Sequence, residues 1–431
     1  MRKLVFIALF FAATAIAADQ NLTLQECIQI AMQNNPDIRL ADKMLESTKV
    51  GVTGSYSSIL PNVSFGTSAT HKTRGAGEDV INGVLTEMPK SSTNLYATGI
   101  SYYQNLYDGG KWLNTIRLAK NSYKNQSFTH DLARQTLVVT VTEKFYGVLQ
   151  AQELLKVYQK SLENSHEQLK KTEEMHRIGQ VAKKDLFKSQ VREGSDRLNV
   201  IQQESTVKLK IAELKVALGV SSEQEIQVYE SSYQLPQQVD METALAKALS
   251  QNPDFNSLKA EKQSSFLQYR IAKSNWYPSI NSTYSYARSG SEFSKLYSDI
   301  SKCYSSSLQL NLSIPIFDGL SRKTTIQQKK IDYMAYDDKI EKRKLEIRSQ
   351  IENLILTMNT YRDMVAINEL NIESAREDLR LQQEMYRLNS ATLLEVLDAQ
   401  VALTTAEGKL ISIKYDAKIA EARLAFAMGT L

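Results

Sequence analysis

The segment QNNPDI at residues 33–38 decides the architecture, because it recurs as SQNPDF at residues 250–255. These two segments are 217 residues apart, and LPNV at 60–63 recurs as YPSI at 277–280 with the same offset. Three further pairs are 210 residues apart: LYDG (106–109) with IFDG (316–319), EMHRI (174–178) with EMYRL (384–388), and ALG (217–219) with AMG (427–429). Similarity at constant offsets indicates an internal duplication of a unit of about 210 residues.

Each copy carries the same order of predicted elements. A helix comes first, over 22–58 and over 241–275, with apolar residues at helical spacing and an internal Asn-Pro. Two strands follow in each copy, because apolar and polar residues alternate there. The alternating runs are 63–69, 96–102, 280–286 and 308–316. The change of offset falls between the strands, which predicts a longer loop at 72–93 than at 289–302.

A long helical stretch follows the strands of each copy. An Asp-Gly pair ends the second strand, and no proline occurs in the next segment, over 110–176 and over 320–386. A helix of this length measures about 100 Å. In the first copy a break at 177–180 precedes a return helix over 181–217. Such helices cannot enclose a globular core and must pack lengthwise, as in a coiled coil.

The composition agrees with this plan and excludes several classes of protein. The 431 residues include 17 Gly and 7 Pro, fewer than usual, as long uninterrupted helices require. The net charge of +4 is too small to indicate a nucleic-acid partner. Cys27 and Cys303 cannot form a disulfide scaffold, and we expect no bond between them. Zinc-binding, phosphate-binding and nucleophile motifs are absent, so we expect neither an enzyme nor a cofactor.

Residues 1–17 have the pattern of a signal peptide, with a basic start, an apolar run and a small-residue cleavage site before Ala18. No later segment has 18 consecutive apolar residues, so a membrane span would need β-strands closed into a barrel. Four predicted strands are too few for one chain to close a barrel, which predicts closure by several subunits. Trp112 and Trp276 lie just outside the strand segments, where aromatic residues mark a membrane boundary, although ordinary packing explains either one equally well.

The whole plan resembles the TolC-type outer membrane efflux proteins. The resemblance is carried by the duplicated helix–strand–strand–helix order, both Asn-Pro-Asp sites, the proline before each first strand, the Asp-Gly after each second strand, and LLEVLDAQ at 393–400. It implies an α+β fold of mostly long α-helices. In this fold three chains form an α-helical barrel that is continuous with a shared twelve-stranded transmembrane β-barrel, four strands coming from each chain.

The resemblance also implies a domain division and a function. The segments are a signal peptide (1–17), a first repeat (18–220), an equatorial linker (221–239) and a second repeat (240–431). The implied function is a passive exit duct for efflux or type I secretion, in the outer membrane and with its helical barrel in the periplasm. A periplasmic adaptor would join this homotrimer to an inner-membrane pump, and no nucleic acid is expected as a partner.

Glu395 and Asp398 are the candidate pore constriction. They lie at i and i+3, on one face of a predicted helix, and a three-fold axis would gather six carboxylates. Such a ring attracts cations, and like-charge repulsion raises its pKa values. The resemblance places an acidic constriction at this motif with Asp at both positions, so Glu395 keeps the charge and lengthens the side chain. From spacing alone, a solvated helix face is the more common interpretation.

Asp185 and Tyr386 match the gate positions of the family, where hydrogen bonds between tip helices hold the channel closed. Lys184 and Ala391 stand where the family often has Thr and Arg, so the rest of the network must differ. The alternative interpretation is two unrelated surface residues.

The two turns between the tip helices are the candidate adaptor contacts. The turns comprise Arg177, Ile178 and Gly179 in the first copy and Arg387, Leu388 and Asn389 in the second. Gly179 or Asn389 suits the positive φ that a tight turn needs. Turn chemistry without a partner explains the same residues.

A second class of function remains open at this point. A periplasmic coiled-coil structural or adaptor protein would also have long helices, without any membrane span. An adaptor would carry a Gly-rich lipoyl-like domain beside a single helical hairpin, and the sequence shows none.

Overall fold

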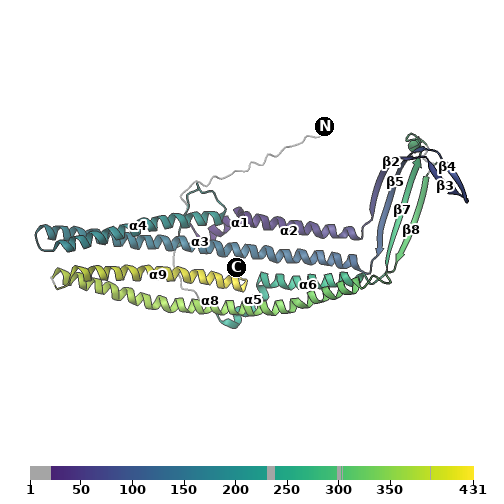
Figure 1. The fold of residues 1–431 in the computed structure, drawn as a ribbon. Helices are drawn as coiled ribbons and strands as arrows, with labels where there is room; N and C mark the ends of the chain where they lie inside the picture. Colours follow the sequence, from purple (N-terminus) through teal and green to yellow (C-terminus); the bar gives the residue numbers. More distant parts are fainter. Residues whose placement is uncertain (1–20, 231–237, 299–301, 303, 389) are drawn as a thin grey trace, which may run out of the picture. The chain divides into compact units, whose positions relative to one another are not determined.

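The computed structural model describes residues 21–230, 238–298, 302, 304–388 and 390–431 (Figure 1). The chain divides into two compact units. The first unit comprises Met1–Ala41, His130–Pro253 and Lys344–Leu431, and the second comprises Asp42–Thr129 and Asp254–Arg343. Each unit therefore contains parts of both copies of the repeat. Among the described helices, none combines the length and the apolarity that a membrane crossing would need.

The helix predicted first in each copy is in fact two helices. They are α1 (Leu24–Asn34) and α2 (Pro36–Ser55) in the first copy, and α5 (Met241–Gln251) and α6 (Pro253–Ser274) in the second. The breaks fall at Asn35, which has an extended backbone, and at Asn252, whose ψ of 119° also lies outside the helical region. The residue before a proline is pushed out of the helical region by the proline ring, which explains both breaks. The prediction of one continuous helix per copy was wrong at these two residues.

The long helices agree closely with the prediction. Helices α3 (Lys111–Arg177) and α8 (Ser321–Arg387) each have 67 residues, and α4 (Lys183–Leu218) and α9 (Leu393–Met428) each have 36. In the first unit these helices lie side by side in the order α4, α3, α9, α8 (Figure 1). The duplication is therefore visible in the lengths of the elements as well as in the motifs.

Matched contacts join the short helices to the return helices. Asn35 Nδ2 donates to the carbonyl oxygen of Ala217 (2.9 Å), and Asn252 Nδ2 donates to that of Ala427 (3.0 Å). Gly219 and Gly429 end the return helices with positive φ. A Cβ on either glycine would lie 2.7 Å from the backbone of the adjoining Asn segment, so the close approach requires glycine. The two asparagines are 217 residues apart and the two alanines that accept their hydrogen bonds are 210 residues apart, so the same contact occurs once in each copy of the repeat.

The second unit contains a four-stranded antiparallel sheet in the order β2-β5-β7-β8. The strands are β2 (Asn62–Arg74), β5 (Ser91–Tyr107), β7 (Ser279–Gly290) and β8 (Tyr304–Ser313). All four predicted strands are present, and the last ends at Ser313, earlier than the alternation indicated. The segment expected as a loop at 72–93 contains a hairpin of β3 (Gly77–Ile81) and β4 (Val84–Met88). Its turn residues Asn82 and Gly83 both have positive φ, as a type I′ turn requires.

The two faces of this sheet differ in chemistry. One row across all four strands is apolar and aromatic, with Val63, Tyr102, Tyr284 and Leu308. The neighbouring row, on the opposite face, consists of Ser64, Ser101, Ser285 and Ser307. The hydroxyls of this row are hydrogen-bonded in pairs, at 2.6 Å between the first two and 2.8 Å between the last two. The alternation predicted from the sequence thus separates an apolar face from a hydroxyl-rich face.

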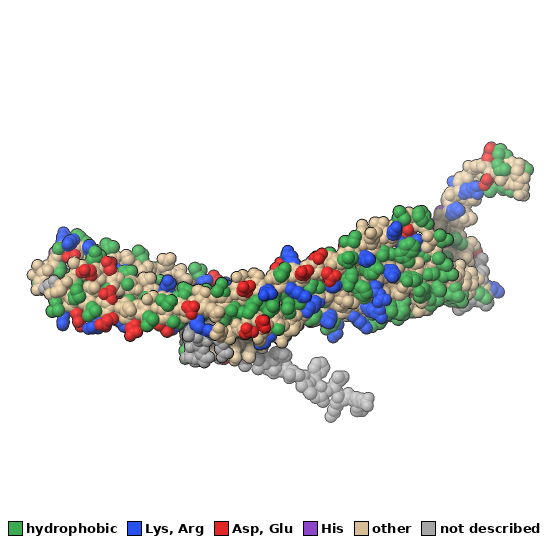
Figure 2. Space-filling view, turned by 90° about the horizontal axis from the view of Figure 1, so that it is seen from below, with side chains coloured by type: hydrophobic (Ala, Val, Ile, Leu, Met, Phe, Trp, Pro, Cys, Tyr) green, Lys and Arg blue, Asp and Glu red, His purple; other side chains and the backbone are tan. Residues whose placement is uncertain are grey.

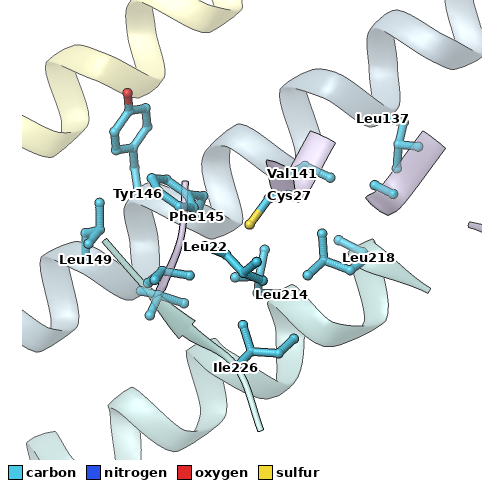
Figure 3. Packing of buried hydrophobic residues seen from close by; sticks show 14 of the residues in the cluster. Leu22, Cys27, Leu137, Val141, Phe145, Tyr146, Leu149, Leu214, Leu218 and Ile226 are labelled. Carbon is cyan, nitrogen blue, oxygen red and sulfur yellow. The ribbon is translucent and has the colours of Figure 1, made fainter. Parts of the chain in front are cut away.

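The core of the first unit lies where α1, α3 and α4 meet (Figure 3). Cys27, Phe145 and Leu214 are fully buried there, and β1 (Asn21–Leu22) pairs in parallel with β6 (Gln227–Val228) at its edge. Burial raises the pKa of the Cys27 thiol to about 12, so this cysteine is an inert core residue. Cys303 lies outside the described residues.

Candidate functional site

Both tip turns expose an apolar side chain next to an arginine. After α3, the amide of Gln180 donates to the carbonyl oxygen of Met175 (2.9 Å), and Gly179 has a φ of +79°. After α8, the amide of Ser390 donates to the carbonyl oxygen of Met385 (2.8 Å). Ile178 and Leu388 are therefore held outward and are exposed, although such side chains are usually buried.

The arginines of these turns, Arg177 and Arg387, are exposed as well. Asn389, the residue expected to supply the positive φ in the second turn, lies outside the described residues. The tip of each hairpin thus presents one aliphatic side chain and one cation to the solvent.

Glu395 has a local role that the sequence reasoning overlooked. Its carboxylate accepts hydrogen bonds from the backbone amide (2.6 Å) and the hydroxyl (2.9 Å) of Thr392, and the Thr392 hydroxyl accepts from the Glu395 amide. This arrangement is a capping box at the start of α9, and the Thr-x-x-Glu spacing was its signal. The bond from the Thr392 backbone is the main reason why the pKa of Glu395 is lowered.

Glu395 and Asp398 both lie on the exposed side of α9, whereas Val396, Leu397 and Ala399 are buried. The predicted shared face is therefore present in the single chain. The expected rise in pKa concerns a ring formed by three chains, and it stays a prediction.

Asp185 and Tyr386 come close to each other at the tip of the first unit. Tyr386 packs against a small apolar cluster of Leu379, Val396 and Ala399. Burial raises the pKa of Tyr386, and the nearby Asp185 carboxylate raises it further. The Tyr386 hydroxyl is buried without a hydrogen-bond partner among the described residues, so the two groups are neighbours but do not form a hydrogen bond here.

A groove of about 780 Å³ opens between α3 and α8 beside these residues. Lys171 and Glu174 line it from α3, and Arg380 and Glu384 line it from α8. Arg380 is held by Glu377 (2.6 Å) and Glu384 (2.9 Å), so its guanidinium is fixed along the helix. The sequence reasoning missed this cluster, although the i,i+3 and i,i+4 spacings indicated it.

A buried polar cluster ties α9 to α3 and α4 farther from the tip. Arg192 forms an ion pair with Asp196 (2.9 Å), and its guanidinium also donates to the Ser161 hydroxyl (3.4 Å). Gln400 donates to the Ser161 carbonyl oxygen and Thr404 donates to the Ser161 hydroxyl, both at 3.3 Å. Asp196 is only 2% exposed. Sequence reasoning missed these residues because nothing local distinguishes a buried aspartate from a solvated one.

The described residues contain no group of His, Cys, Asp and Glu side chains arranged to hold a metal ion. The described side chains at the tip form hydrogen bonds and ion pairs, and Ile178 and Leu388 add exposed apolar surface.

Comparison with known proteins agrees with the arrangement. The sequence model described as outer membrane efflux protein matches residues 27–220 and 244–430, one segment in each copy. Outer membrane protein TolC of Salmonella enteritidis is 21% identical over 444 residues, which cover 100% of this chain and 87% of that protein. Alkaline protease secretion protein AprF of Pseudomonas aeruginosa is 22% identical over 424 residues, covering 95% and 85% of the two chains.

Solved structures share the fold. The channel CusC superposes with a TM-score of 0.83 at 18% identity, over 96% of this chain and 95% of that chain. The CmeC outer membrane channel of Campylobacter jejuni superposes with a TM-score of 0.81 at 17% identity, over 94% and 85%. The helix–strand–strand–helix repeat is thus an architecture already seen in outer membrane channels.

Proposed function

Because the chain belongs to the outer membrane efflux protein family, we propose that three copies assemble into one exit duct, which a periplasmic adaptor connects to an inner-membrane pump. Its membership makes it an outer membrane channel of the kind that serves efflux or type I secretion. The family consists of transport channels, and we propose no enzymatic activity for this chain. In this duct the segment 221–239 is an equatorial linker between repeats 18–220 and 240–431, and 1–17 is removed on export.

Two apolar stripes on the first unit carry the proposal of an assembly. The stripes comprise Val191, Leu198, Leu209 and Val216 on α4, and Leu345, Leu356, Ile367 and Leu370 on α8. All eight side chains are exposed, and hydrophobic side chains are also visible at the surface in Figure 2. Exposed apolar side chains that repeat along one face of a helix favour a protein interface there.

The positions of the stripes indicate a ring. Helices α4 and α8 are the outermost of the four side-by-side helices, so the two stripes lie on different helices at opposite ends of this row (Figure 1). A contact between two different surfaces is heterologous, and it closes into a ring when the rotation between subunits allows. The sheet supports the same assembly, because β2 and β8 are edge strands with one unpaired side each. Three sheets of four strands would close into twelve, with the apolar face toward lipid and the hydroxyl-rich face toward the lumen.

The tip supplies the other parts of the duct. We assign Glu395 and Asp398 to the acidic constriction, because both carboxylates are exposed on α9 and the capping box fixes the orientation of Glu395. We assign Asp185 and Tyr386 to the latch, supported by their proximity and by the unpartnered Tyr386 hydroxyl.

The tip turns are the proposed contacts of the adaptor. Arg177, Ile178 and Gly179 form one contact and Arg387, Leu388 and Asn389 form the other. The exposed Arg177 and Arg387 support this assignment, because arginine is enriched among the residues that anchor protein interfaces. Ile178 and Leu388 add exposed apolar surface that a partner can cover.

Conductance in planar bilayers tests the duct and its constriction. The protein purified from outer membranes should migrate as a trimer without heating and should form cation-selective pores. The double variant Glu395→Gln with Asp398→Asn should lose most of this selectivity, because it removes six negative charges from the ring. Glu373→Gln is the matched control, since it neutralises an exposed carboxylate elsewhere on the helices.

Two results would contradict the proposal at different points. A soluble monomer without conductance would rule out the channel assembly. Trimeric pores whose selectivity is the same in the double variant and in Glu373→Gln would leave the channel in place but remove Glu395 and Asp398 from the constriction.

A further inference from the structure

The chain that follows β7 folds back onto the apolar face of the sheet. It contains the short helix α7 (Lys295–Ser298), which packs against β5 and β7. At this end of the sheet Thr98 pairs with Arg288, and both lie on the face of Tyr284, because strand side chains alternate with period two. Both are buried, whereas Leu308 on the same face is largely exposed. The described part of the connection between β7 and β8 therefore covers one end of the apolar face.

Arg288 fastens this connection to the sheet. The Arg288 side chain is only 6% exposed. Its guanidinium donates from Nε (3.3 Å) and from Nη2 (3.0 Å) to the backbone carbonyl oxygen of Lys302. Hydrogen bonds from a charged donor are stronger than those between neutral groups. The chain just before β8 is thus held against the apolar face rather than extended beyond the end of the sheet.

The outer side of the connection carries aromatic rings. We call residues 293–298 the α7 segment. Leu296 is buried, whereas Phe293 and Tyr297 are 56% and 55% exposed. The Phe293 ring has edge contacts with Tyr96 of β5, at 5.8 Å between ring centres, and with Tyr297, at 5.7 Å. The α7 segment therefore has a buried aliphatic side and an exposed aromatic side.

The α7 segment lies where a membrane boundary is expected. Strand β7 begins shortly after α6, so the α7 segment follows the end of the sheet that is away from the helices. On β8, Leu312 and Tyr304 share the apolar face and are eight residues apart, or about 27 Å along a strand. The apolar band of a transmembrane barrel is about 25 Å tall. Tyr304 pairs with Arg288, so both lie near one limit of such a band.

The opposite limit of the band also has an aromatic residue. Trp276 is exposed and directly precedes β7, at the end of the sheet next to the helices. Aromatic side chains are enriched at both boundaries of a membrane, because their rings are apolar while tyrosine and tryptophan also carry a polar group. Trp276 and the α7 segment thus have the chemistry and the spacing of two boundary markers.

We propose that the α7 segment is a lipid-interface anchor. Its aromatic rings lie between the head groups and the acyl chains of the outer leaflet, on the outer wall of the barrel. This inference rests on the outer membrane duct proposed above and adds a contact with lipid to it. The continuity of the α7 segment with the apolar face of the sheet identifies lipid as the occupant. Because Arg288 holds the connection on this face, the α7 segment leaves the mouth of the duct uncovered.

The corresponding connection in the first copy is built differently. It contains the β3–β4 hairpin, in which Glu78 pairs with Glu87 and is followed by Asp79. Carboxylates are costly inside a membrane, so this hairpin extends into water. The two copies therefore divide the roles at this end of the sheet: one connection contacts lipid and the other contacts solvent.

The accessibility of spin labels tests the position of the α7 segment. Tyr297→Cys, Leu308→Cys and Ser307→Cys are labelled singly in a Cys303→Ser background, since Cys27 is buried. Trimers are reconstituted into vesicles of phosphatidylethanolamine and phosphatidylglycerol. Collisions of each label with oxygen, which concentrates in lipid, are compared with collisions with a water-soluble nickel chelate. Leu308 and Ser307 are matched controls, because they are adjacent on β8 and lie on opposite faces.

The oxygen-to-nickel ratio at Tyr297 should be several-fold above that at Ser307 and should approach that at Leu308. A ratio at Tyr297 equal to that at Ser307, while Leu308 is lipid-exposed, overturns the anchor and leaves the duct intact. Equal, water-like ratios at Leu308 and Ser307 overturn the proposed membrane-spanning sheet, and the anchor with it.

Arg288→Ala gives an independent test of the fastening. In the protein labelled at Tyr297→Cys, loss of the guanidinium should make the label more mobile, which narrows its spectral lines. Arg74→Ala is the matched control, because Arg74 is exposed and ends β2 at the same end of the sheet. Unchanged mobility in Arg288→Ala, or an equal gain in Arg74→Ala, overturns the role of Arg288.

Discussion

The two helical hairpins of the first unit, α3–α4 and α8–α9, have helices of equal length, but the residues buried between their helices differ in chemistry. We call each set of buried residues the seam of its hairpin. In the α3–α4 hairpin, the residues buried toward the tip are mainly polar: Ser161, Ser165, Thr172, Ser189 and Asp196. In the α8–α9 hairpin they are mainly apolar: Leu379, Leu393, Val396, Leu397 and Ala399. The helix starts differ too, because α9 begins with a capping box and α4 begins at Ala182 without a side-chain cap.

The difference shows how a duplicated unit can acquire two roles. Apolar burial is non-directional and stabilises a hairpin whatever its exact register. Buried hydroxyls and charges must find partners, so they favour one arrangement of the helices and penalise others. We infer that α8–α9 is held mainly by apolar burial and that α3–α4 is held mainly by specific polar contacts.

The largest expected effect tests the polar seam. Asp196→Ala should lower the free energy of unfolding of the first unit by about 3 kcal/mol, because it leaves the half-buried Arg192 guanidinium without its carboxylate partner. Chemical denaturation followed by circular dichroism measures this loss. Combining Asp196→Leu with Arg192→Met removes both charges and should cost far less. An equal loss in the two variants would mean that packing, rather than charge pairing, holds this seam.

The next effect tests the apolar seam. Leu379→Ala should cost about 2–4 kcal/mol, because it removes a buried side chain from the cluster with Val396 and leaves a cavity. Leu381→Ala is the control on the same helix, since Leu381 is exposed and its truncation should cost within about 0.5 kcal/mol. Urea unfolding of both variants provides the comparison. A similar loss of unfolding free energy in the two variants would show that burial of Leu379 in the apolar seam does not stabilise this hairpin.

A smaller effect comes from the helix starts. Thr392→Ala removes the cap of α9 and should cost about 1 kcal/mol. The reciprocal change, Ala182→Thr, adds a hydroxyl that can accept from the amide of Asp185, and it should stabilise α4 by about 0.5 kcal/mol. Hydrogen exchange of the first-turn amides measures both. If Ala182→Thr leaves exchange in α4 unchanged, the absence of a cap is not what distinguishes the two hairpins.

The smallest effect is a pH dependence limited to the second hairpin. Hydrogen bonds from Thr392 lower the pKa of Glu395 below its unfolded value, so their contribution is complete above the unfolded pKa. It is lost as the pH falls through the folded pKa, and the first turn of α9 should then exchange its amides faster. Glu395→Gln should exchange at a rate that does not vary over this acidic range. Equal pH dependence in the two proteins would place the titrating group elsewhere.

Much of the fold could be predicted from the sequence because the duplication supplies an internal check. The predicted helix 110–176 and the observed α3 differ by one residue at each end. Two features were missed although their signals are visible: the breaks at Asn35 and Asn252, each followed by proline, and the β3–β4 hairpin with its Asn-Gly turn.

The candidate site was predictable only where the signal is local. The capping box of Glu395 is a short pattern, and it could have been recognised from four consecutive residues. The burial of Asp196 depends on which face α4 turns toward α3 and α9, and a single helix does not carry that information. The proximity of Asp185 to Tyr386 likewise depends on how the two hairpins pack against each other.

The serine row of the sheet has a consequence for transport. Ser64 and Ser101 share one hydrogen bond, as do Ser285 and Ser307, so each pair keeps donor and acceptor sites that water or a passing molecule can use on about equal terms. A solute that moves along this row exchanges hydrogen bonds to water for hydrogen bonds to serine hydroxyls of about the same strength. In the proposed duct this serine row would therefore not hold a solute more tightly than water does.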